Sequence, residues 1–284
     1  MSTFTDVDKT ALAVARKLGV PCDRPVVLAE GMNAVVHLRP SPLVARVTRV
    51  AHLVRPVEAL AGVVAMARAL RGLVVPPSDQ VDPGPHVEDG RYVTFWAHVE
   101  GVPATPAEAG SSLRALHQAA RRYDLSLRSF DPRPEALRIA DLVGGEAGAV
   151  LRAAAERMNR PELSEQPVHG DAHLGNVLAG GLWLDLDEAC AGPPEWDLAC
   201  LRHCSFLFGE LERETRDALA AYGSYDEGAV AALDPLVVSS PRRGAPWRRS
   251  SPSPSDPVRY AAWPGSGSAM PFNIHIGASV GMRL

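Results

Sequence analysis

Short runs of apolar residues, separated by turn-forming residues, dominate the first hundred positions of the chain. Residues 25–29, 34–38 and 43–47 are three such runs, and residues 73–75 and 91–97 follow on either side of a long loop rich in Pro, Gly and Asp. Runs of this length that are rich in β-branched residues and bounded by turns are typical of strands. Because tight turns join the first three, the pattern predicts an antiparallel sheet with five strands.

Helical spacing of apolar residues appears near the N-terminus and through the second half. One helix opens at Thr5 and ends at Gly19, and another covers residues 56–70. Thr105, followed by a proline and then by Glu108, is a strong helix start, because the side chains and backbone of such residues cap one another. Further helices are expected at residues 135–143, 146–158 and 198–208. The pattern therefore predicts an α+β protein whose sheet precedes a mainly helical part.

Residues 168–187 contain the densest candidate chemistry. Two apolar runs, 176–178 and 182–184, flank Gly180 and Gly181, and this predicts a hairpin. Metal-ligand residue types stand on both sides of the hairpin: His169, Asp171, His173, Asn176, Asp185 and Asp187. A hairpin brings its ends together, so we expect Asp171, Asn176 and Asp185 to converge. Two carboxylates and an amide oxygen suit Mg²⁺.

This stretch resembles the motif of a known enzyme family. The motif is His169-Gly170-Asp171, then Asn176, then an apolar strand that ends at Asp185. It is similar to that of the aminoglycoside phosphotransferase and choline kinase-like family of small-molecule kinases. The resemblance implies a two-lobed, protein-kinase-like α+β fold. The N-terminal nucleotide-binding lobe would span residues 1–98, and the helical catalytic and substrate lobe would span residues 99–235.

The resemblance also implies roles for individual residues. Asp171 would be the catalytic base that accepts the proton of the substrate hydroxyl, while Asn176 and Asp185 would hold Mg²⁺ against the phosphates of ATP. The implied nucleotide-binding residues are Gly31, Asn33, Arg46, Trp96 and His98. His169, Asp187 and Asp197 would be supporting residues. The implied reaction moves the γ-phosphate of ATP to a hydroxyl of a small molecule, such as an aminoglycoside, an amino alcohol or a sugar.

Two positions depart from the family pattern. Members usually carry a lysine on the third strand, which reaches the ATP phosphates, and a glutamate on the next helix, which pairs with that lysine. The matching residues here are Arg46 and Val63, and Glu58 is the only acid nearby. Arginine and lysine are not equivalent phosphate ligands. A catalytically weak, nucleotide-binding relative of the family is therefore an alternative.

A different class of enzyme is also compatible with part of the motif. His169, Asp171 and His173 alternate along the chain. They could ligate zinc or a pair of metal ions, with Asp185 or Asp187 completing the site. Such a metallohydrolase would hold a transition metal tightly and would not respond to ATP. It would leave Asn176 without a role, which favours the kinase interpretation.

Composition bears on location and partners. The chain has 284 residues, 46% of them hydrophobic, and its four cysteines are scattered. The sequence has neither an apolar run of membrane-spanning length nor the pattern of a signal peptide. We therefore expect a cytoplasmic protein whose partner is a small-molecule hydroxyl acceptor, with no nucleic-acid or membrane partner.

The composition changes near the C-terminus. Residues 236–284 contain six arginines, one acid and many Pro, Ser and Gly residues. Such a segment cannot bury enough apolar surface to order itself, so we expect a disordered tail. One hypothesis is that the tail arises from a frameshift or from a divergent end of the gene.

Overall fold

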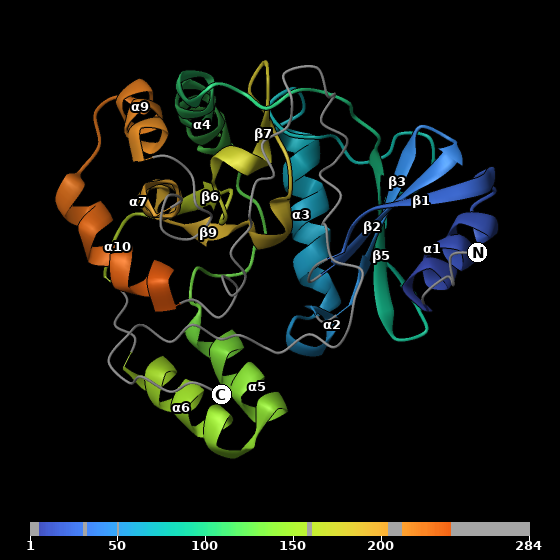
Figure 1. Ribbon diagram of the computed structural model, residues 1–284, viewed down its shortest axis with the longest axis horizontal. Helices are drawn as coiled ribbons and strands as arrows, with labels where there is room; N and C mark the ends of the chain where they lie inside the picture. Colours follow the sequence, from blue (N-terminus) through green and yellow to red (C-terminus); the bar gives the residue numbers. More distant parts are fainter. Residues whose placement is uncertain (1–5, 31–32, 50, 158–160, 204–211, 240–284) are drawn as a thin grey trace.

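Five strands form one antiparallel sheet in the computed structural model, which describes all residues except 1–5, 31–32, 50, 158–160, 204–211 and 240–284. The spatial order is β1-β2-β3-β5-β4 (Figure 1). The strands are β1 (Cys22–Glu30), β2 (Asn33–Pro40), β3 (Leu43–Thr48), β4 (His86–Glu88) and β5 (Arg91–Ala97). The predicted α+β fold class with an N-terminal antiparallel sheet is confirmed.

The two faces of this sheet have different partners. Helix α1 (Asp6–Lys17) packs on one face, where Val36, Ala45 and Phe95 are fully buried. Side chains alternate between faces along a strand, so Val35 and Val44 point to the other side, where they form a separate small cluster with Leu28. Arg46 lies two residues after Val44 and therefore shares the face that is turned away from α1.

The structure corrects one of the predicted strands. Residues 73–75 are not part of the sheet, whose edge strand is instead β4, within the region expected to be a loop. The segment pairs with Trp183 of the hairpin: Val75 N donates to Trp183 O at 2.9 Å, and Trp183 N donates to Leu73 O at 2.9 Å. The apolar pattern shows that this segment is buried, but it does not show which backbone it pairs with.

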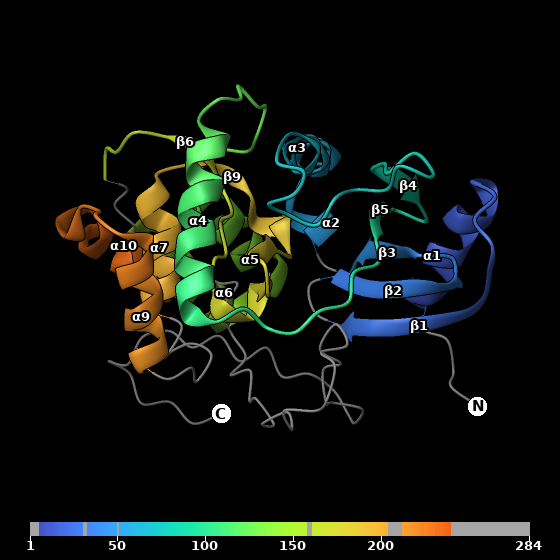
Figure 2. The same cartoon turned by 90° about the horizontal axis from the view of Figure 1, so that it is seen from above.

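Helices make up most of the remaining described structure. Helix α3 lies between the sheet and the other large helices in both ribbon views (Figures 1 and 2). The helices are α2 (Ala51–Val54), α3 (Val57–Ala69), α4 (Pro106–Ala120), α5 (Arg133–Val143), α6 (Gly145–Glu156), α7 (Pro194–Arg202), α9 (Glu212–Tyr222) and α10 (Glu227–Ser239). The predicted cap of α4 is confirmed: Glu108 N donates to Thr105 Oγ1, and Thr105 N donates to Glu108 Oε2.

Two predicted boundaries need adjustment. The helix expected at residues 198–208 begins earlier, because Pro194 occupies its first turn, where a proline is well tolerated. Its expected end lies outside the described residues. Helix α10 runs into the segment that begins at residue 236. The expectation of disorder for residues 240–284 also lies outside the described residues.

The larger hydrophobic core joins α3, α4 and α7 to the hairpin. Its fully buried members include Met66, Leu113, Trp183 and Leu198. Helices α4 and α9 approach closely at Gly110, where a Cβ atom would collide with the backbone carbonyl of Ala218. This core holds the hairpin between α3 and α4, and so fixes the position of the polar residues at the ends of the hairpin.

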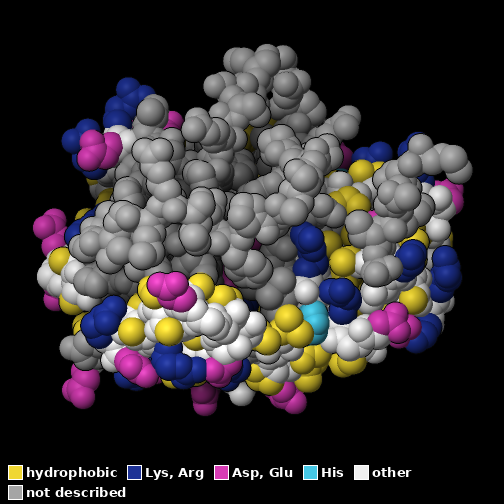
Figure 3. Space-filling view, turned by 60° about the horizontal axis from the view of Figure 1, so that its bottom comes forward, with side chains coloured by type: hydrophobic (Ala, Val, Ile, Leu, Met, Phe, Trp, Pro, Cys, Tyr) yellow, Lys and Arg dark blue, Asp and Glu magenta, His cyan; other side chains and the backbone are white. Residues whose placement is uncertain are grey.

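Charge on the described surface is mixed. Figure 3 shows lysine and arginine side chains interspersed with acidic and apolar ones on the part of this face that is not grey. Among the described residues, no helix is both long and apolar enough to cross a membrane. Charged residues also occur in the interior, between the sheet and the helical part, and these form the site described next.

Candidate active site

The site is built on a loop that follows a short buried strand. Strand β6 (Gln166–Val168) pairs antiparallel with β9 (Cys190–Gly192), and the loop from His169 leads into a single 3-10 turn, η1 (Leu174–Asn176). Gly170 has φ +85°, and a Cβ atom there would collide with the carbonyl of Glu188. Both the left-handed backbone and the close approach require glycine at this position.

His169 ties the loop to the hairpin. The ring is fully buried, Nε2 lies 2.7 Å from Leu184 O, and Asp171 N donates to Nδ1 at 3.3 Å. A ring that accepts a hydrogen bond at Nδ1 and donates one from Nε2 to Leu184 O satisfies both contacts. Both ring nitrogens therefore have partners, so His169 has no nitrogen left for a metal ion.

Asp197 on α7 accepts hydrogen bonds from the same loop. Its Oδ2 accepts from His169 N at 2.8 Å, and its Oδ1 accepts from Gly170 N at 2.7 Å. His117 Nε2 lies 2.9 Å from Oδ2. Burial opposes ionisation of this carboxyl, but the hydrogen bond and charge of His117 outweigh it and hold the pKa of Asp197 below its ordinary value. Asp197 thus braces two successive amides of the loop.

His117 is a contact that sequence reasoning missed. It lies on α4 and is almost fully buried, with Nδ1 3.0 Å from the hydroxyl oxygen of Tyr222 on α9. Burial, with the nearby charge of Asp197, raises the pKa of Tyr222 to about 12. The chain Tyr222–His117–Asp197 therefore connects three helices to the loop. Eighty positions separate His117 from Asp197, so no local pattern could have shown the pair.

Asp171 and Asn176 lie at the two ends of the loop. The side chain of Asp171 is partly exposed, and its Oδ2 is 3.9 Å from His173 Nε2. Asn176 Nδ2 donates to the backbone O of Asp171 at 3.1 Å, and Asn176 O accepts from Leu184 N at 2.8 Å. The amide nitrogen of Asn176 is thus used in fixing the loop, and its Oδ1 is the atom left to serve as a ligand.

Asp185 ends the hairpin formed by β7 (Val177–Leu178) and β8 (Leu182–Trp183). Its backbone is left-handed, with φ 56° and ψ 61°, which is uncommon for a residue with a side chain and costs on the order of 1–3 kcal/mol. A turn of 3-10 helix, η2 (Leu186–Glu188), follows directly. Backbone strain of this kind is characteristic of functional positions, because the surrounding structure must hold it.

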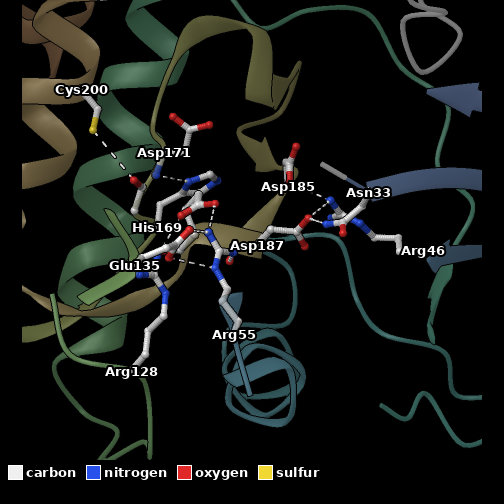
Figure 4. Close-up of polar contacts among 12 residues, drawn as sticks. Asn33, Arg46, Arg55, Arg128, Glu135, His169, Asp171, Asp185, Asp187 and Cys200 are labelled. Atoms are coloured by element: carbon white, nitrogen blue, oxygen red, sulfur yellow. Dashed lines mark hydrogen bonds and ion pairs between the residues drawn. The ribbon is translucent and has the colours of Figure 1, made fainter. Parts of the chain in front are cut away.

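A single arginine from the sheet faces both carboxylates of this turn. Arg46 Nη2 is 2.7 Å from Asp185 Oδ1 and 2.6 Å from Asp187 Oδ2 (Figure 4). Asn33 Nδ2 also donates to Asp187 Oδ2. Burial disfavours the Asp185 anion, but Arg46 outweighs it and keeps the pKa of Asp185 below its ordinary value. Burial, helped by the nearby Asp185, raises the pKa of Asp187.

Asn176 and Asp185 carry ligand types that suit a hard divalent cation. Asn176 has an amide oxygen and Asp185 a carboxylate, and Mg²⁺ prefers a small number of such protein ligands plus phosphate oxygens and water. The arginine that already faces Asp185 shows that this carboxylate is directed at a position suited to positive charge. By contrast, no group of three or more His, Cys, Asp or Glu in the described part of the chain could hold a metal ion. His169, Asp171 and His173 are therefore not assembled as a zinc site.

The predicted nucleotide residues are only partly brought together. Arg46, Trp96 and Asp185 line one narrow cleft between the sheet and the hairpin, together with Val44, Val75, Trp183 and Leu186. Asn33 reaches the same acidic turn through Asp187. His98 instead stacks on His37, with ring centroids 3.7 Å apart, and is not among the residues that line the cleft. Gly31 lies outside the described residues.

The predicted departure at Val63 is visible in the fold. Val63 is buried in the large core, and Glu58 is exposed. Among the described residues, neither pairs with Arg46, which forms ion pairs with Asp185 and Asp187 instead. The basic residue of β3 thus turns across the cleft to the hairpin rather than to the helix.

An antiparallel sheet facing a helical part that carries such a loop and hairpin defines a protein-kinase-like fold. The chain belongs to the phosphotransferase enzyme family, whose model matches residues 11–233. This confirms the family suggested by the motif and its enzyme class, small-molecule phosphotransferases. No curated protein sequence matches the chain.

Solved structures with the same fold are distant in sequence. A microcompartment-associated aminopropanol kinase has 17% identity and a TM-score of 0.56, and the match covers 82% of this chain and 87% of the other. Choline kinase LicA from Streptococcus pneumoniae has 15% identity and a TM-score of 0.56, covering 83% and 88%. The streptomycin–ATP ternary complex of APH(2'')-IIa has 11% identity and a TM-score of 0.51, covering 84% and 88%.

Proposed function

We propose that the protein is an ATP- and Mg²⁺-dependent phosphotransferase that moves the γ-phosphate to a hydroxyl of a small molecule. The observation that carries the proposal is the left-handed Asp185. Its carboxylate faces Arg46 across the cleft and lies one hairpin away from Asn176. Strained backbone positions cluster at functional sites, and a fixed carboxylate beside a basic strand residue offers groups for a metal ion and for phosphates. The similarity to the ATP complex of APH(2'')-IIa supports the choice of nucleotide.

In the proposed reaction, each residue positions or neutralises charge. Mg²⁺, when bound, would neutralise the charge of the ATP phosphates. Asn176 and Asp185 would hold that ion, and the Arg46 guanidinium would contact the phosphates. Asp171 would accept the proton of the acceptor hydroxyl as the oxygen attacks phosphorus. Phosphoryl transfer requires little more from a protein than positioning and electrostatic stabilisation.

The loop geometry supports Asp171 as the base. Asp197 accepts from the amides of His169 and Gly170, the two residues directly before Asp171. Asn176 donates to the Asp171 carbonyl at 3.1 Å. The backbone is thereby held on both sides while the carboxylate stays partly exposed. A general base needs this combination of fixed position and access to substrate.

For the acceptor we propose a chemical class and not a particular compound. The family and its structural neighbours act on small molecules that carry hydroxyl groups. The neighbours described above include an aminopropanol kinase, a choline kinase and a complex of APH(2'')-IIa with streptomycin and ATP. We propose an acceptor of this kind, in which an alcohol group receives the phosphate.

The first test is a thermal-shift titration of the purified chain with ATP, with and without Mg²⁺. Binding at a ligand concentration of 100 times Kd stabilises the folded state by about 2.7 kcal/mol, so Tm should rise by several degrees more with ATP and Mg²⁺ together than with ATP alone. Asp185→Asn should lose the Mg²⁺-dependent part of the shift. Asp141→Asn is the matched control, because Asp141 is exposed on α5. A Mg²⁺-dependent shift without phosphate transfer to any screened acceptor would favour the catalytically weak alternative.

A chelator gives the opposing result. Two results together would contradict the proposal and favour a tightly held transition metal. Tm would fall when EDTA is added to protein without ATP, and Tm would not change when ATP is added. An acceptor screen that follows ADP release then tests the transfer step itself.

A further inference from the structure

Arg55 is a buried cation that the motif does not account for. It lies between α2 and α3, and its side chain is 5% exposed. Its guanidinium binds Glu135 of α5 in a bidentate arrangement, Nε to Oε2 at 3.1 Å and Nη2 to Oε1 at 3.0 Å. A buried arginine needs partners for all its donors, and here they come from distant parts of the chain.

The remaining donors of Arg55 reach the turn after Asp185. Nη1 donates to the backbone O of Asp187 at 3.0 Å, and Nη2 donates to Glu188 Oε1 at 2.6 Å. Figure 4 shows Arg55 extending toward this turn beside Glu135. One side chain therefore holds both the backbone and a side chain of η2.

A second arginine completes the group. Arg128 Nη2 donates to the Glu188 backbone O at 2.6 Å and to Glu188 Oε2 at 3.0 Å. Arg55, Arg128, Glu135 and Glu188, here called the Arg55 cluster, carry two positive and two negative charges. The cluster joins the start of α3, the helix α5 and the turn that follows Asp185.

Stability alone does not explain such a cluster. A buried ion group contributes little net stability, because desolvation offsets the attraction between the charges. What the cluster supplies is geometry: bidentate arginine contacts fix orientation as well as distance. The contact to the Asp187 carbonyl lies two residues from the strained Asp185 backbone.

We propose that Arg55 is a positioning residue that holds the Asp185–Glu188 turn in the geometry needed for Mg²⁺–ATP, and that links this turn to α5. In this chain it braces the turn from the start of α3, the helix on which Val63 stands where the family pattern has a glutamate. The proposal rests on the proposed function for the identity of the ligand. The position of the turn itself can be tested without any ligand.

The test separates position from stability with a double variant. Arg55→Met removes the bidentate partner of the buried Glu135 carboxylate, so Tm should fall by roughly 10 °C. Arg55→Met combined with Glu135→Met removes both charges, and Tm should return most of the way. Glu188 keeps Arg128 as its partner in this double variant. Arg133→Ala is the control, since Arg133 is an exposed residue of α5 that pairs with Asp131.

Ligand binding is the first readout. In the double variant, Kd for ATP in the presence of Mg²⁺ should remain about tenfold weaker than in the wild type, while Kd for ATP without Mg²⁺ changes less than twofold. The single variant Arg55→Lys should also bind Mg²⁺–ATP more weakly than the wild type, because an ammonium lacks the bidentate fork of a guanidinium. Full recovery of Mg²⁺–ATP binding in the double variant would overturn the proposal and leave the cluster a purely structural feature.

Hydrogen exchange of the ligand-free protein is the second readout. Backbone amides of residues 185–190 should exchange at least tenfold faster in the double variant than in Arg133→Ala. Unchanged exchange there overturns the positioning role, whatever the protein binds. If exchange is faster in the double variant but the wild-type protein does not bind Mg²⁺–ATP, the two claims separate. Arg55 then does position the turn, and the proposed function is overturned instead.

Discussion

The Nη2 atom of Arg46 lies 2.7 Å from Asp185 Oδ1, joining the sheet to the end of the hairpin across the cleft. The same atom lies 2.6 Å from Asp187 Oδ2. One cation is therefore shared by two carboxylates that stand two residues apart. In the proposed reaction Asp185 would also hold Mg²⁺, so Arg46 and that ion would both offset the charge of Asp185.

Arg46→Met should make the protein more responsive to Mg²⁺. Without the guanidinium, the two carboxylates repel each other, and Tm at pH 7 should fall by roughly 3 °C, a modest value because Asp185 is 46% exposed. Added Mg²⁺ should then raise Tm more than in the wild type. Scanning fluorimetry over a Mg²⁺ titration measures both effects. Arg24→Met, an exposed change on β1, is the control, and equal Mg²⁺ responses in Arg46→Met and Arg24→Met would contradict the prediction.

Asp171→Ala should abolish transfer while leaving nucleotide binding intact. General-base catalysis contributes about 10²- to 10⁴-fold to rate, so kcat should fall by that factor. KM for ATP should stay within twofold, because Asp171 is not among the residues that line the cleft between Arg46 and Asp185, where we propose that the nucleotide binds. Steady-state assays with an accepted substrate, and calorimetry with Mg²⁺–ATP, give the two numbers. Near-normal turnover would show that another group takes the proton.

Gly170 and Gly180 provide a matched pair of glycine substitutions. Both have positive φ, +85° and +83°, but a Cβ atom at Gly170 meets the Glu188 carbonyl whereas one at Gly180 has open space. Gly180→Ala should lower the free energy of unfolding by about 1–2 kcal/mol, because only the left-handed backbone disfavours a side chain there. Gly170→Ala should cost more than about 3 kcal/mol, because the loop must also move. Urea unfolding measures both, and equal losses would mean that the close approach to Glu188 carries no energy.

Asp197 should govern part of the acid unfolding. Its folded-state pKa lies below the ordinary value of 3.8, so its charged form stabilises the folded protein. That contribution is present above the ordinary value and is lost as pH falls through the lower, folded-state pKa. Asp197→Asn should be less stable at pH 7 by about 3 kcal/mol, through loss of charge-assisted hydrogen bonds. Its stability should also fall less steeply below pH 4.

Urea unfolding between pH 2.5 and pH 7 measures the effect of Asp197. Asp141→Asn, an exposed change on α5, should keep the acid limb of the wild-type curve. If the stability of Asp197→Asn fell as steeply below pH 4 as that of the wild type, Asp197 would not govern this part of the acid unfolding.

The parts of the fold that the sequence predicted best are those fixed by local chemistry. The capping box at Thr105, the Gly180–Gly181 hairpin and the three N-terminal strands all follow from neighbouring residues. The motif also predicts that Asp171, Asn176 and Asp185 converge, and the structure ties Asn176 to the backbone of Asp171 and of Leu184, the residue before Asp185. Residues 73–75 failed as a sheet strand because an apolar run shows burial without naming its partner.

The parts that sequence could not predict depend on distant pairs. Arg55 meets Glu135 across 80 positions and Glu188 across 133. His117 reaches Asp197 in the same way. Each of these residues reads locally as an ordinary helix-flanking charge or packing side chain. Their burial becomes meaningful only when the tertiary structure places a counter-charge beside them.

The pairing of residues 73–75 with Trp183 has a mechanical consequence. Two backbone hydrogen bonds join this segment to β8, and α3 packs in the same core as the hairpin. Helix α3 and residues 73–75 would therefore travel with the helical part in any large displacement. Opening and closing over a nucleotide would be a movement of the sheet and α1, with its pivots between β3 and α3, directly after residue 75, and after β5.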